Sequence, residues 1–421
     1  MTDTAKKLLS FLSKTPSVFH VIAEVKKELQ ENGFTELSES ESWTLEPDKG
    51  YFVTRNGSSL IAFRIPNDRK PGYRIVASHS DSPGFKLKQK PVISVDGKYS
   101  VLGTESYGGG IFSTWMDRPL SVAGRVFTGE DGKLTEKLVN VDRDMCIMPN
   151  APIHFNRSVN KGHEFNVAKD MKPIYGEAGA EAEFEAEIAA AAGVNPEDVL
   201  AKDLFLYVRE QGRIWGRNEE FVSAPKLDDL ACAYVTLRGF LEGKKTQHSS
   251  FYCVFDNEET GSGTRQGAAS LFFYDVMRRV NENLGCSYEQ HVIDVAEGMA
   301  LSADNAHAFS PNYSEFFDPN EKVVMNRGIA LKFNAAQKYS TDGESGAFFA
   351  ELCKKAEVPY QIYSNRADLA GGSTLGNIMS MNIPVRVCDL GFPQLAMHSS
   401  FETCGASDIE YMRKAIKVFF E

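Results

Sequence analysis

Strand-like apolar runs alternate with helical patterns over the second half of the chain, and this rhythm limits the possible folds more than any other feature. From Ser223 onward, segments with helical spacing of apolar residues follow short runs of β-branched and aromatic residues. The expected helices are 227–242, 267–283, 346–356 and 407–420, and the expected strands are 251–255, 291–295, 299–302 and 384–387. Strands that alternate with helices predict an α/β fold with a mixed, mostly parallel sheet flanked by helices.

The N-terminal part shows a similar pattern. Residues 4–32 have helical spacing with an interruption near Pro16, and 51–65 and 73–78 are expected strands. These segments therefore belong to the same α/β unit as the second half of the chain.

The region from about residue 86 to 222 has a different texture. Short β-like runs alternate there with glycine-rich turns, among them Gly108-Gly109-Gly110. A chain of 421 residues is also longer than one hydrophobic core usually organises. We therefore expect a β-rich domain inserted into the α/β domain, with the pieces 1–81, 82–223 and 224–421.

An acidic pair follows one of the expected strands directly. The apolar run FYCVF, residues 251–255, ends in Asp256-Asn257-Glu258-Glu259. Adjacent carboxylates at the tip of a buried strand repel each other and are costly to desolvate, so a cation beside them would stabilise them. One glutamate of such a pair suits a metal ligand, and the other suits a general base that acts on water.

Four other segments place ligand-type side chains beside apolar runs. They are His79-Ser80-Asp81, Asp228-Asp229, Ser302-Ala303-Asp304-Asn305 and the segment 394–399, which contains His398. In open α/β sheets, binding and catalytic groups gather at the carboxyl ends of the strands. We therefore expect these segments to converge with Glu258 and Glu259.

The combined set has the composition of a two-metal site. A co-catalytic metal pair needs a bridging carboxylate, two further ligands for each ion and a separate base, and Zn²⁺ accepts both histidine nitrogen and carboxylate oxygen. The six residues available for these roles are His79, Asp228, Glu258, Glu259, Asp304 and His398. Asp81 lies two residues after His79 and is expected to accept the second imidazole N–H.

Each of these residues also has an ordinary structural explanation. Glu258-Glu259 fit solvated loop acids, and Asp228-Asp229 fit the acidic start of a helix. His398 alone fits a hydrogen-bonded core histidine. Together, however, the residues amount to a complete ligand set, and this favours the metal site.

Composition argues against several other classes of function. The net charge of −11 leaves no basic surface for phosphate groups, so neither nucleic-acid binding nor docking on an anionic membrane is expected. The seven cysteines are odd in number and lack a CxxC spacing, as expected of free thiols in a reducing compartment. With no signal-peptide pattern and no apolar run of membrane-spanning length, we expect a cytoplasmic protein.

Five segments together resemble the M18 metallopeptidases, the aspartyl aminopeptidases. They are ASHSDSPGFKLK, SAPKLDDL, FDNEETGS, SADNAHA with the following SPNY, and LGFPQLAMHS. The resemblance extends from Thr15 to the C-terminal helix. It implies a di-zinc aminopeptidase-like fold and a peptide hydrolase that removes N-terminal residues, with a preference for Asp or Glu, from peptides with a free N-terminus.

The resemblance also implies a role for each site residue. Asp228 would bridge two zinc ions, His79 and Asp304 would hold one ion, and Glu259 and His398 would hold the other. Glu258 would be the general base, and Asp81 would orient His79. Co²⁺ or Mn²⁺ would also suit a site of nitrogen and oxygen ligands.

The resemblance further implies an assembly. Family members form tetrahedral homo-dodecamers whose active sites face an interior chamber, and the inserted region would be a dimerisation domain. His154, within Ile153-His154-Phe155-Asn156-Arg157, matches a family histidine that reaches into the active site of a neighbouring subunit.

One departure from the family pattern concerns the substrate. Members that prefer acidic residues carry a lysine in the segment that corresponds to 334–337, where this chain has Ala335-Ala336. A buried carboxylate needs a cation, so Lys338 or Arg366 would have to supply it. Two other interpretations stay open. The same metal site would also serve an amidohydrolase or a carboxypeptidase, and a self-assembling protein with a relic site would have a similar sequence.

Overall fold

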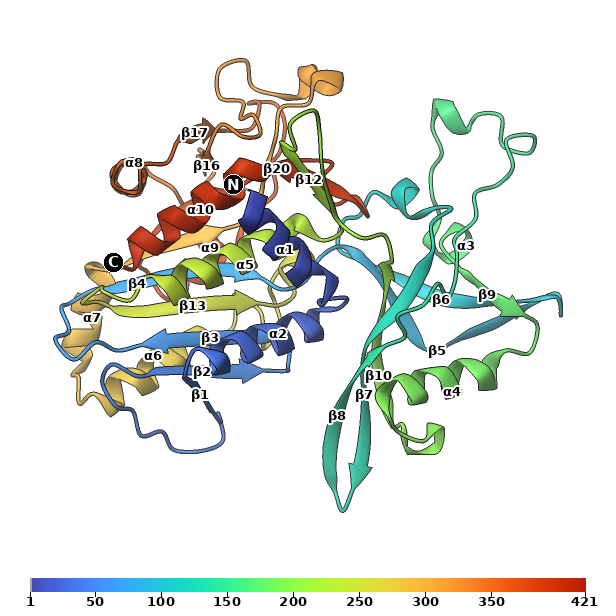
Figure 1. Cartoon of the computed structure of the whole chain (residues 1–421), viewed down its shortest axis with the longest axis horizontal. Coiled ribbons are helices and arrows are strands. Elements are labelled where there is room, and N and C mark those ends of the chain that lie inside the picture. Colours follow the sequence, from blue (N-terminus) through green and yellow to red (C-terminus); the bar gives the residue numbers. More distant parts are fainter. Residues whose placement is uncertain (1) are drawn as a thin grey trace.

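A nine-stranded sheet organises the larger part of the molecule in the computed structural model, which describes residues 2–421 (Figure 1). Its strands lie in the order β1 (Phe34–Leu37), β2 (Gly50–Arg55), β3 (Ser59–Arg64), β13 (Ser249–Phe255), β4 (Tyr73–His79), β14 (Met299–Ala303), β18 (Arg386–Gly391), β16 (Ile329–Lys332) and β17 (Tyr360–Tyr363). The central strands β13, β4, β14 and β18 run parallel, whereas β3 is antiparallel to β2 and β13, and β16 is antiparallel to β18. The expected mixed, mostly parallel sheet is confirmed.

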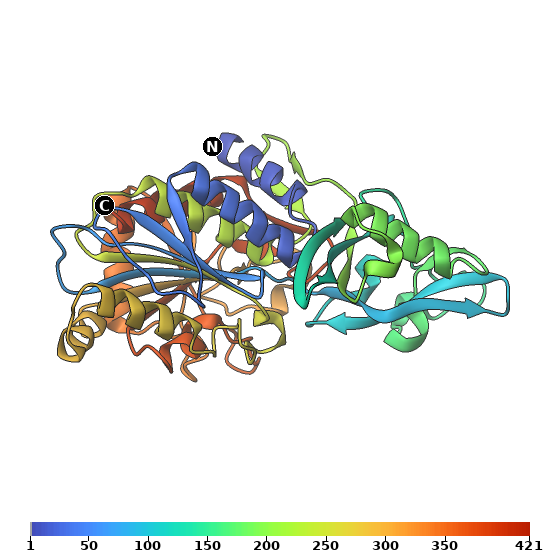
Figure 2. The ribbon, with the colours of Figure 1, turned by 90° about the horizontal axis from the view of Figure 1, so that it is seen from below.

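Helices cover both faces of this sheet (Figure 2). One face packs against α1 (Thr2–Ser13), α2 (Val18–Glu31), α5 (Leu227–Glu242), α8 (Gly343–Ala356) and α10 (Ala406–Phe419). The other face packs against α6 (Phe272–Asn283), α7 (Tyr288–Ala296) and α9 (Leu375–Ser380). Strand β13 shows why both faces are apolar: Tyr252 and Val254 belong to the first core and Phe251 and Cys253 to the second.

A six-stranded antiparallel sheet lies beside this unit, at the right of Figures 1 and 2. Its strands are β8 (Lys133–Asn140), β7 (Leu120–Glu130), β10 (Ala201–Val208), β5 (Gly84–Val95), β6 (Tyr99–Tyr107) and β9 (Ile174–Glu177), with α3 (Val167–Asp170) and α4 (Glu181–Ala192) packed near it. The sheet has a hydrophobic core of its own around Phe184, Leu204 and Leu206. These elements fall inside the segment 82–223 that the sequence predicts as an inserted domain.

A third, five-stranded sheet lies close to the carboxyl ends of the central strands. It consists of β11 (Arg213–Trp215), β12 (Phe221–Ala224), β20 (Glu402–Gly405), β19 (Pro393–Leu395) and β15 (Ala306–His307). The short 3-10 helices are η1 (Phe112–Trp115), η2 (Val159–Lys161), η3 (Pro196–Asp198), η4 (Glu258–Thr260) and η5 (Pro311–Phe316). Within residues 2–421, no helix is both long enough and apolar enough to cross a lipid bilayer.

One predicted strand is wrong. Residues 291–295 lie inside α7, because the Ser287 side chain accepts a hydrogen bond from the backbone N–H of Gln290 and so caps a helix. The β-branched pair Val292 and Ile293, which suggested a strand, lies on the exposed side of this helix. Helix α6 also begins later than expected, at Phe272.

Register in the sheet fixes where the functional residues meet. Phe255, at the end of β13, is paired with His79, at the end of β4, and Ser302 of β14 is paired with Ala77 two residues earlier on β4. The parallel strands β13, β4 and β14 therefore end side by side. Residues that follow them are held at one edge of the sheet.

Candidate metal centre

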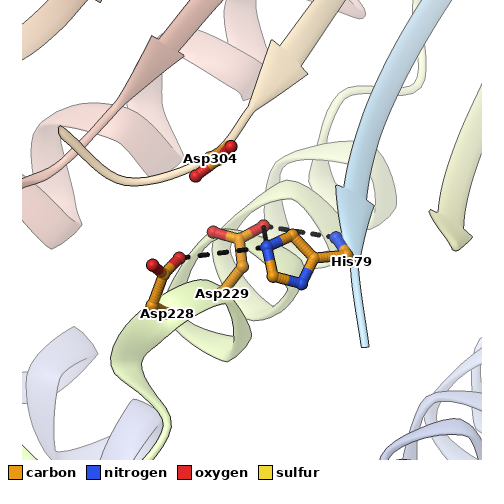
Figure 3. A group of neighbouring side chains, drawn as sticks. All are labelled: His79, Asp228, Asp229 and Asp304. Carbon is orange, nitrogen blue, oxygen red and sulfur yellow. Dashed lines mark hydrogen bonds and ion pairs between the residues drawn. The ribbon is translucent and has the colours of Figure 1, made fainter. Parts of the chain in front are cut away.

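Four polar side chains meet at this edge of the sheet (Figure 3). His79 is the last residue of β4, Asp228 and Asp229 lie in the first turn of α5, and Asp304 follows β14 directly. One possible ligand atom from each residue lies within 4.8 Å of the others. All four residues are buried, and the most exposed, Asp304, retains only 9% of its accessible surface.

Asp228 also belongs to a second group of possible ligand atoms, with Glu259 and His398. His398 Nε2 lies 3.4 Å from Asp228 Oδ2 and 3.5 Å from Glu259 Oε1. Glu258 and Glu259 form η4 just after β13, and together with His79 they make a third such group. The structure therefore brings the five predicted ligands and Glu258 together, with Asp228 shared by two groups.

Three carboxylate oxygens at the centre of the cluster, Asp228 Oδ1, Asp229 Oδ1 and Glu259 Oε1, have no hydrogen-bond partner among the described residues. A buried oxygen without a partner is costly, and bound cations would satisfy the oxygens of Asp228 and Glu259, the two that belong to predicted ligands. In the metal-free cluster, burial and the charge of Asp228 raise the pKa of Glu259 well above its ordinary value, and burial raises the pKa of Glu258 to about 7. Nitrogen and oxygen donors of these types fit zinc.

Neighbouring carboxylates raise the pKa of both imidazoles in the metal-free cluster. Burial disfavours a charged His79, but the neighbouring Asp229 and Asp81 outweigh this effect and raise its pKa well above the ordinary value. Burial also disfavours a charged His398, but the Asp228 and Glu259 carboxylates outweigh this effect and raise its pKa to about 10. Metal binding would therefore compete with protonation of both imidazoles, because a ligating nitrogen must be unprotonated.

Asp81 holds the turn that carries both glutamates. Its Oδ1 accepts the backbone N–H of Glu258 at 3.1 Å, and its Oδ2 accepts the backbone N–H of Glu259 at 3.2 Å and the hydroxyl of Tyr107 at 2.7 Å. The Nδ1 of His79 lies 3.1 Å from the backbone oxygen of Asp81 and 3.4 Å from Oδ1. The imidazole therefore has a backbone acceptor in addition to the carboxylate that the sequence predicted.

Glu402 in β20 connects the two sides of the cluster, and sequence reasoning missed it. Its Oε2 accepts the backbone N–H of Asp228 at 2.9 Å, and its Oε1 accepts the backbone N–H of His398 at 2.7 Å. Only 1% of Glu402 is exposed. Burial and the charge of Asp228 raise its pKa to about 8. The available signal was an acid inside the otherwise uncharged segment FETCG, residues 401–405, since a buried acid needs hydrogen-bond donors.

Lys332 is a second residue that sequence reasoning missed. Lys332 is the last residue of β16, and only 2% of it is exposed. Its Nζ lies 3.6 Å from Asp304 Oδ1. A lysine between the apolar neighbours Leu331 and Phe333 was the available signal, since lysine is rarely buried without an acidic partner.

His154 lies apart from the cluster. It is exposed, in the loop between β8 and η2, beside the exposed Ile153 and Phe155. Among the contacts of residues 2–421, none joins His154 to the metal-binding residues. Its predicted role in the site of a neighbouring subunit stays a prediction.

The double contact of Glu402 predicts the effect of replacing it with glutamine. In Glu402→Gln one carboxylate oxygen becomes an amide donor, so the backbone N–H of Asp228 or of His398 loses its acceptor. We expect the free energy of unfolding of the metal-free protein to fall by about 1–3 kcal/mol in urea titrations. Glu351→Gln, at a side chain that is 75% exposed, should change it by less than about 0.5 kcal/mol. Equal stability of Glu402→Gln and the wild type would contradict this account.

Comparisons with known proteins identify the family of this chain. The sequence model of the family described as "Aminopeptidase I zinc metalloprotease (M18)" matches residues 11–420. A probable M18 family aminopeptidase 2 of Clostridium novyi is 40% identical, and the alignment covers 99% of this chain and 98% of that protein.

Solved structures give the same result. A chain in the cryo-EM structure of the Ape4 and Nbr1 complex superposes with a TM-score of 0.96 at 33% identity, and the match covers 100% of this chain and 85% of that chain. The S. cerevisiae mApe1 dodecamer gives a TM-score of 0.87 at 26% identity, with 99% and 96% covered. The chain therefore belongs to the M18 family of zinc metalloproteases, and it is a metallo-aminopeptidase, a hydrolase of peptides.

Proposed function

We propose that the cluster holds two zinc ions per subunit and serves to hydrolyse the first bond of a peptide. The position of Asp228 carries this proposal, because its two carboxylate oxygens face the two different histidines of the cluster. Its Oδ1 lies 3.9 Å from His79 Nε2, and its Oδ2 lies 3.4 Å from His398 Nε2. A bridging carboxylate with further ligands on each side is what a co-catalytic metal pair requires.

The remaining ligands divide between the two sides of Asp228. His79 and Asp304 share a group with one another and would hold the first ion, whereas Glu259 and His398 share another and would hold the second. Glu258 lies between them, in a group with His79 and Glu259. Zinc bound at these positions supplies the Lewis acidity that acidifies a water molecule and polarises the scissile carbonyl. Co²⁺ and Mn²⁺ would suit the same donors.

Glu258 is the proposed general base. Its backbone N–H donates to Asp81 Oδ1 at 3.1 Å. One oxygen of its carboxylate lies within 4.8 Å of a possible ligand atom of His79 and of one of Glu259. In the metal-free cluster burial raises the pKa of Glu258 to about 7, so the fold makes this carboxylate a stronger base than an ordinary glutamate. It takes a proton from the attacking water and delivers a proton to the leaving amine.

Replacing Glu258 with glutamine tests this assignment. Glu258→Gln should lower the rate of hydrolysis of amino-acid p-nitroanilides by about 10²–10⁴-fold, because the amide cannot accept the proton. The zinc content per subunit should stay that of the wild type, since Glu258 is not a proposed ligand. Turnover at the wild-type rate with full zinc content would contradict the assignment.

The preferred N-terminal residue depends on a cation in the pocket for its side chain. Lys338 is half-buried, and its Nζ donates to the backbone oxygen of Gly371 at 3.0 Å, a neutral partner that a substrate carboxylate would replace. Arg366 already pairs with Asp368 at 2.6 Å. We therefore propose Lys338 as the residue that confers a preference for Asp and Glu.

Substitution of Lys338 separates acidic preference from aminopeptidase activity. The wild type should cleave Asp- and Glu-p-nitroanilide faster than Leu-p-nitroanilide. Lys338→Met should lower kcat/KM for the acidic substrates by about 10–100-fold, the loss expected for an unpaired buried charge, with Leu-p-nitroanilide unaffected. Arg366→Met is the matched control. A wild type that prefers Leu or Lys would overturn the acidic preference, and cleavage of N-acetylated substrates would favour an amidohydrolase.

The six-stranded sheet is the proposed dimerisation region, within an inserted domain of residues 82–223. This segment exposes large apolar side chains, among them Leu134 of β8 at 71% and Phe155, in the loop after β8, at 86%. The dodecamer of the related S. cerevisiae mApe1 supports assembly into a homo-dodecamer. His154, next to Phe155, is proposed to reach the active site of a neighbouring subunit.

Co-expression of two inactive variants tests this role of His154. His154→Ala subunits keep the proposed base but lack the donated histidine, and Glu258→Gln subunits keep the histidine but lack the base. Mixed assemblies should therefore be more active than either variant alone. If the mixture has only the sum of the two separate activities, His154 does not act across subunits.

A further inference from the structure

The Gly108–Gly110 turn, named here the glycine turn, belongs to the six-stranded sheet but contacts residues of the metal centre. It connects the end of β6 to η1. The carbonyl oxygen of Gly109 lies 2.9 Å from His398 Nδ1, and the backbone N–H of Ile111 donates to the carbonyl oxygen of His398 at 2.9 Å. The turn and the residue that follows it therefore bind the imidazole and the backbone of this one histidine.

These contacts leave one nitrogen of His398 available. Its backbone N–H donates to Glu402 Oε1, its backbone oxygen accepts from Ile111, and its Nδ1 has Gly109 as a partner. The remaining polar atom, Nε2, lies 3.4 Å from Asp228 and 3.5 Å from Glu259. An acceptor at Nδ1 fixes both the tautomer and the rotation of a ligating imidazole.

Gly108 makes this close approach possible. Its φ is +67°, a backbone conformation that side chains disfavour, and a Cβ at this position would lie 3.0 Å from the Cβ of Glu259. An alanine would therefore be strained and would push the turn away from Glu259. Gly108 thus allows the turn to lie against one proposed ligand while Gly109 binds the other.

Thr114 fixes the loop around His398 from the same side. Its Oγ1 donates to the carbonyl of Ile111 at 2.6 Å and accepts the backbone N–H of Ser400 at 2.9 Å. Its own carbonyl accepts from the hydroxyl of Ser400 at 2.6 Å. The segment from Gly108 to Thr114 therefore holds both His398 itself and Ser400, two residues later in the chain.

We propose that the glycine turn is a positioning element for one of the two ions, the one assigned to Glu259 and His398. This inference rests on the proposed two-ion function. The turn presents His398 Nε2 to Asp228 and Glu259, so the affinity for this ion depends on a segment that belongs to the six-stranded sheet. His79 and Asp304, the proposed ligands of the other ion, have no contact with the glycine turn among the described residues. The affinity for that ion should therefore not depend on the turn.

Zinc titration of the metal-free protein against a chromophoric chelator tests the proposal. Gly108→Ala should weaken the binding of one zinc ion by about 10–100-fold, as loss of an outer-shell partner does, and leave the other unchanged. Thr114→Val is a milder change of nearly the same shape and should weaken the same ion by roughly fivefold. The visible spectrum of the Co²⁺ form should change for one ion only.

Gly97→Ala is the matched control. Gly97, in the β5–β6 turn of the same sheet, has a φ of +62° and nothing within 4 Å of its would-be Cβ, so this variant carries the backbone strain without the displacement. Both of its zinc affinities should equal those of the wild type.

His398→Ala separates the failure of this inference from the failure of the proposed function. If His398→Ala binds both ions normally, the ligand assignment is wrong. If His398→Ala loses one ion but Gly108→Ala binds both with wild-type affinity, the positioning role is wrong. Should Gly108→Ala fail to fold, Thr114→Val decides alone, and unchanged zinc affinities in that variant overturn the proposal.

Discussion

The burial of several carboxylates around one small volume is the constraint on which the rest of the structure depends. Two such charges 4 Å apart repel each other by about 4 kcal/mol at an effective dielectric constant of 20. Glu259 and Asp304 are held in this arrangement because β13, β4 and β14 end side by side, and Asp228 is held by the contact of its backbone N–H with Glu402. The unpartnered oxygens and the raised pKa values of Glu259 and Asp304 have one common remedy, a pair of cations.

The metal centre draws on all three sheets. The nine-stranded sheet supplies His79 and the positions of Glu259 and Asp304, and the small sheet supplies Glu402, which holds the backbones of Asp228 and His398. The six-stranded sheet contributes contacts from the end of β6: Tyr107 donates to Asp81, and the next residues reach His398. A region that would otherwise be assigned to assembly alone is therefore in direct contact with the residues proposed to bind metal.

Several of the proposed ligands could be predicted from the sequence because they follow apolar runs whose type could be recognised. The carboxyl ends of parallel strands share one edge of the sheet, so the sequence alone predicts that His79, Glu259 and Asp304 lie close together. Glu402 and the carbonyl of Gly109 could not be predicted in this way. The sequence marks Glu402 only as an acid within the uncharged segment FETCG and does not indicate its two backbone donors, and a carbonyl leaves no trace in a sequence. The strand predicted at 291–295 failed because β-branched residues on an exposed helix face mimic a strand, and the cap at Ser287 decided the outcome.

The central claim is that Asp228 bridges two zinc ions, and anomalous diffraction at the zinc absorption edge from crystals of the zinc-loaded protein tests it most directly. The account predicts two anomalous peaks per subunit, roughly 3.5–4 Å apart, with one oxygen of Asp228 directed to each. A single peak, or a second peak without contact to Asp228, would contradict it.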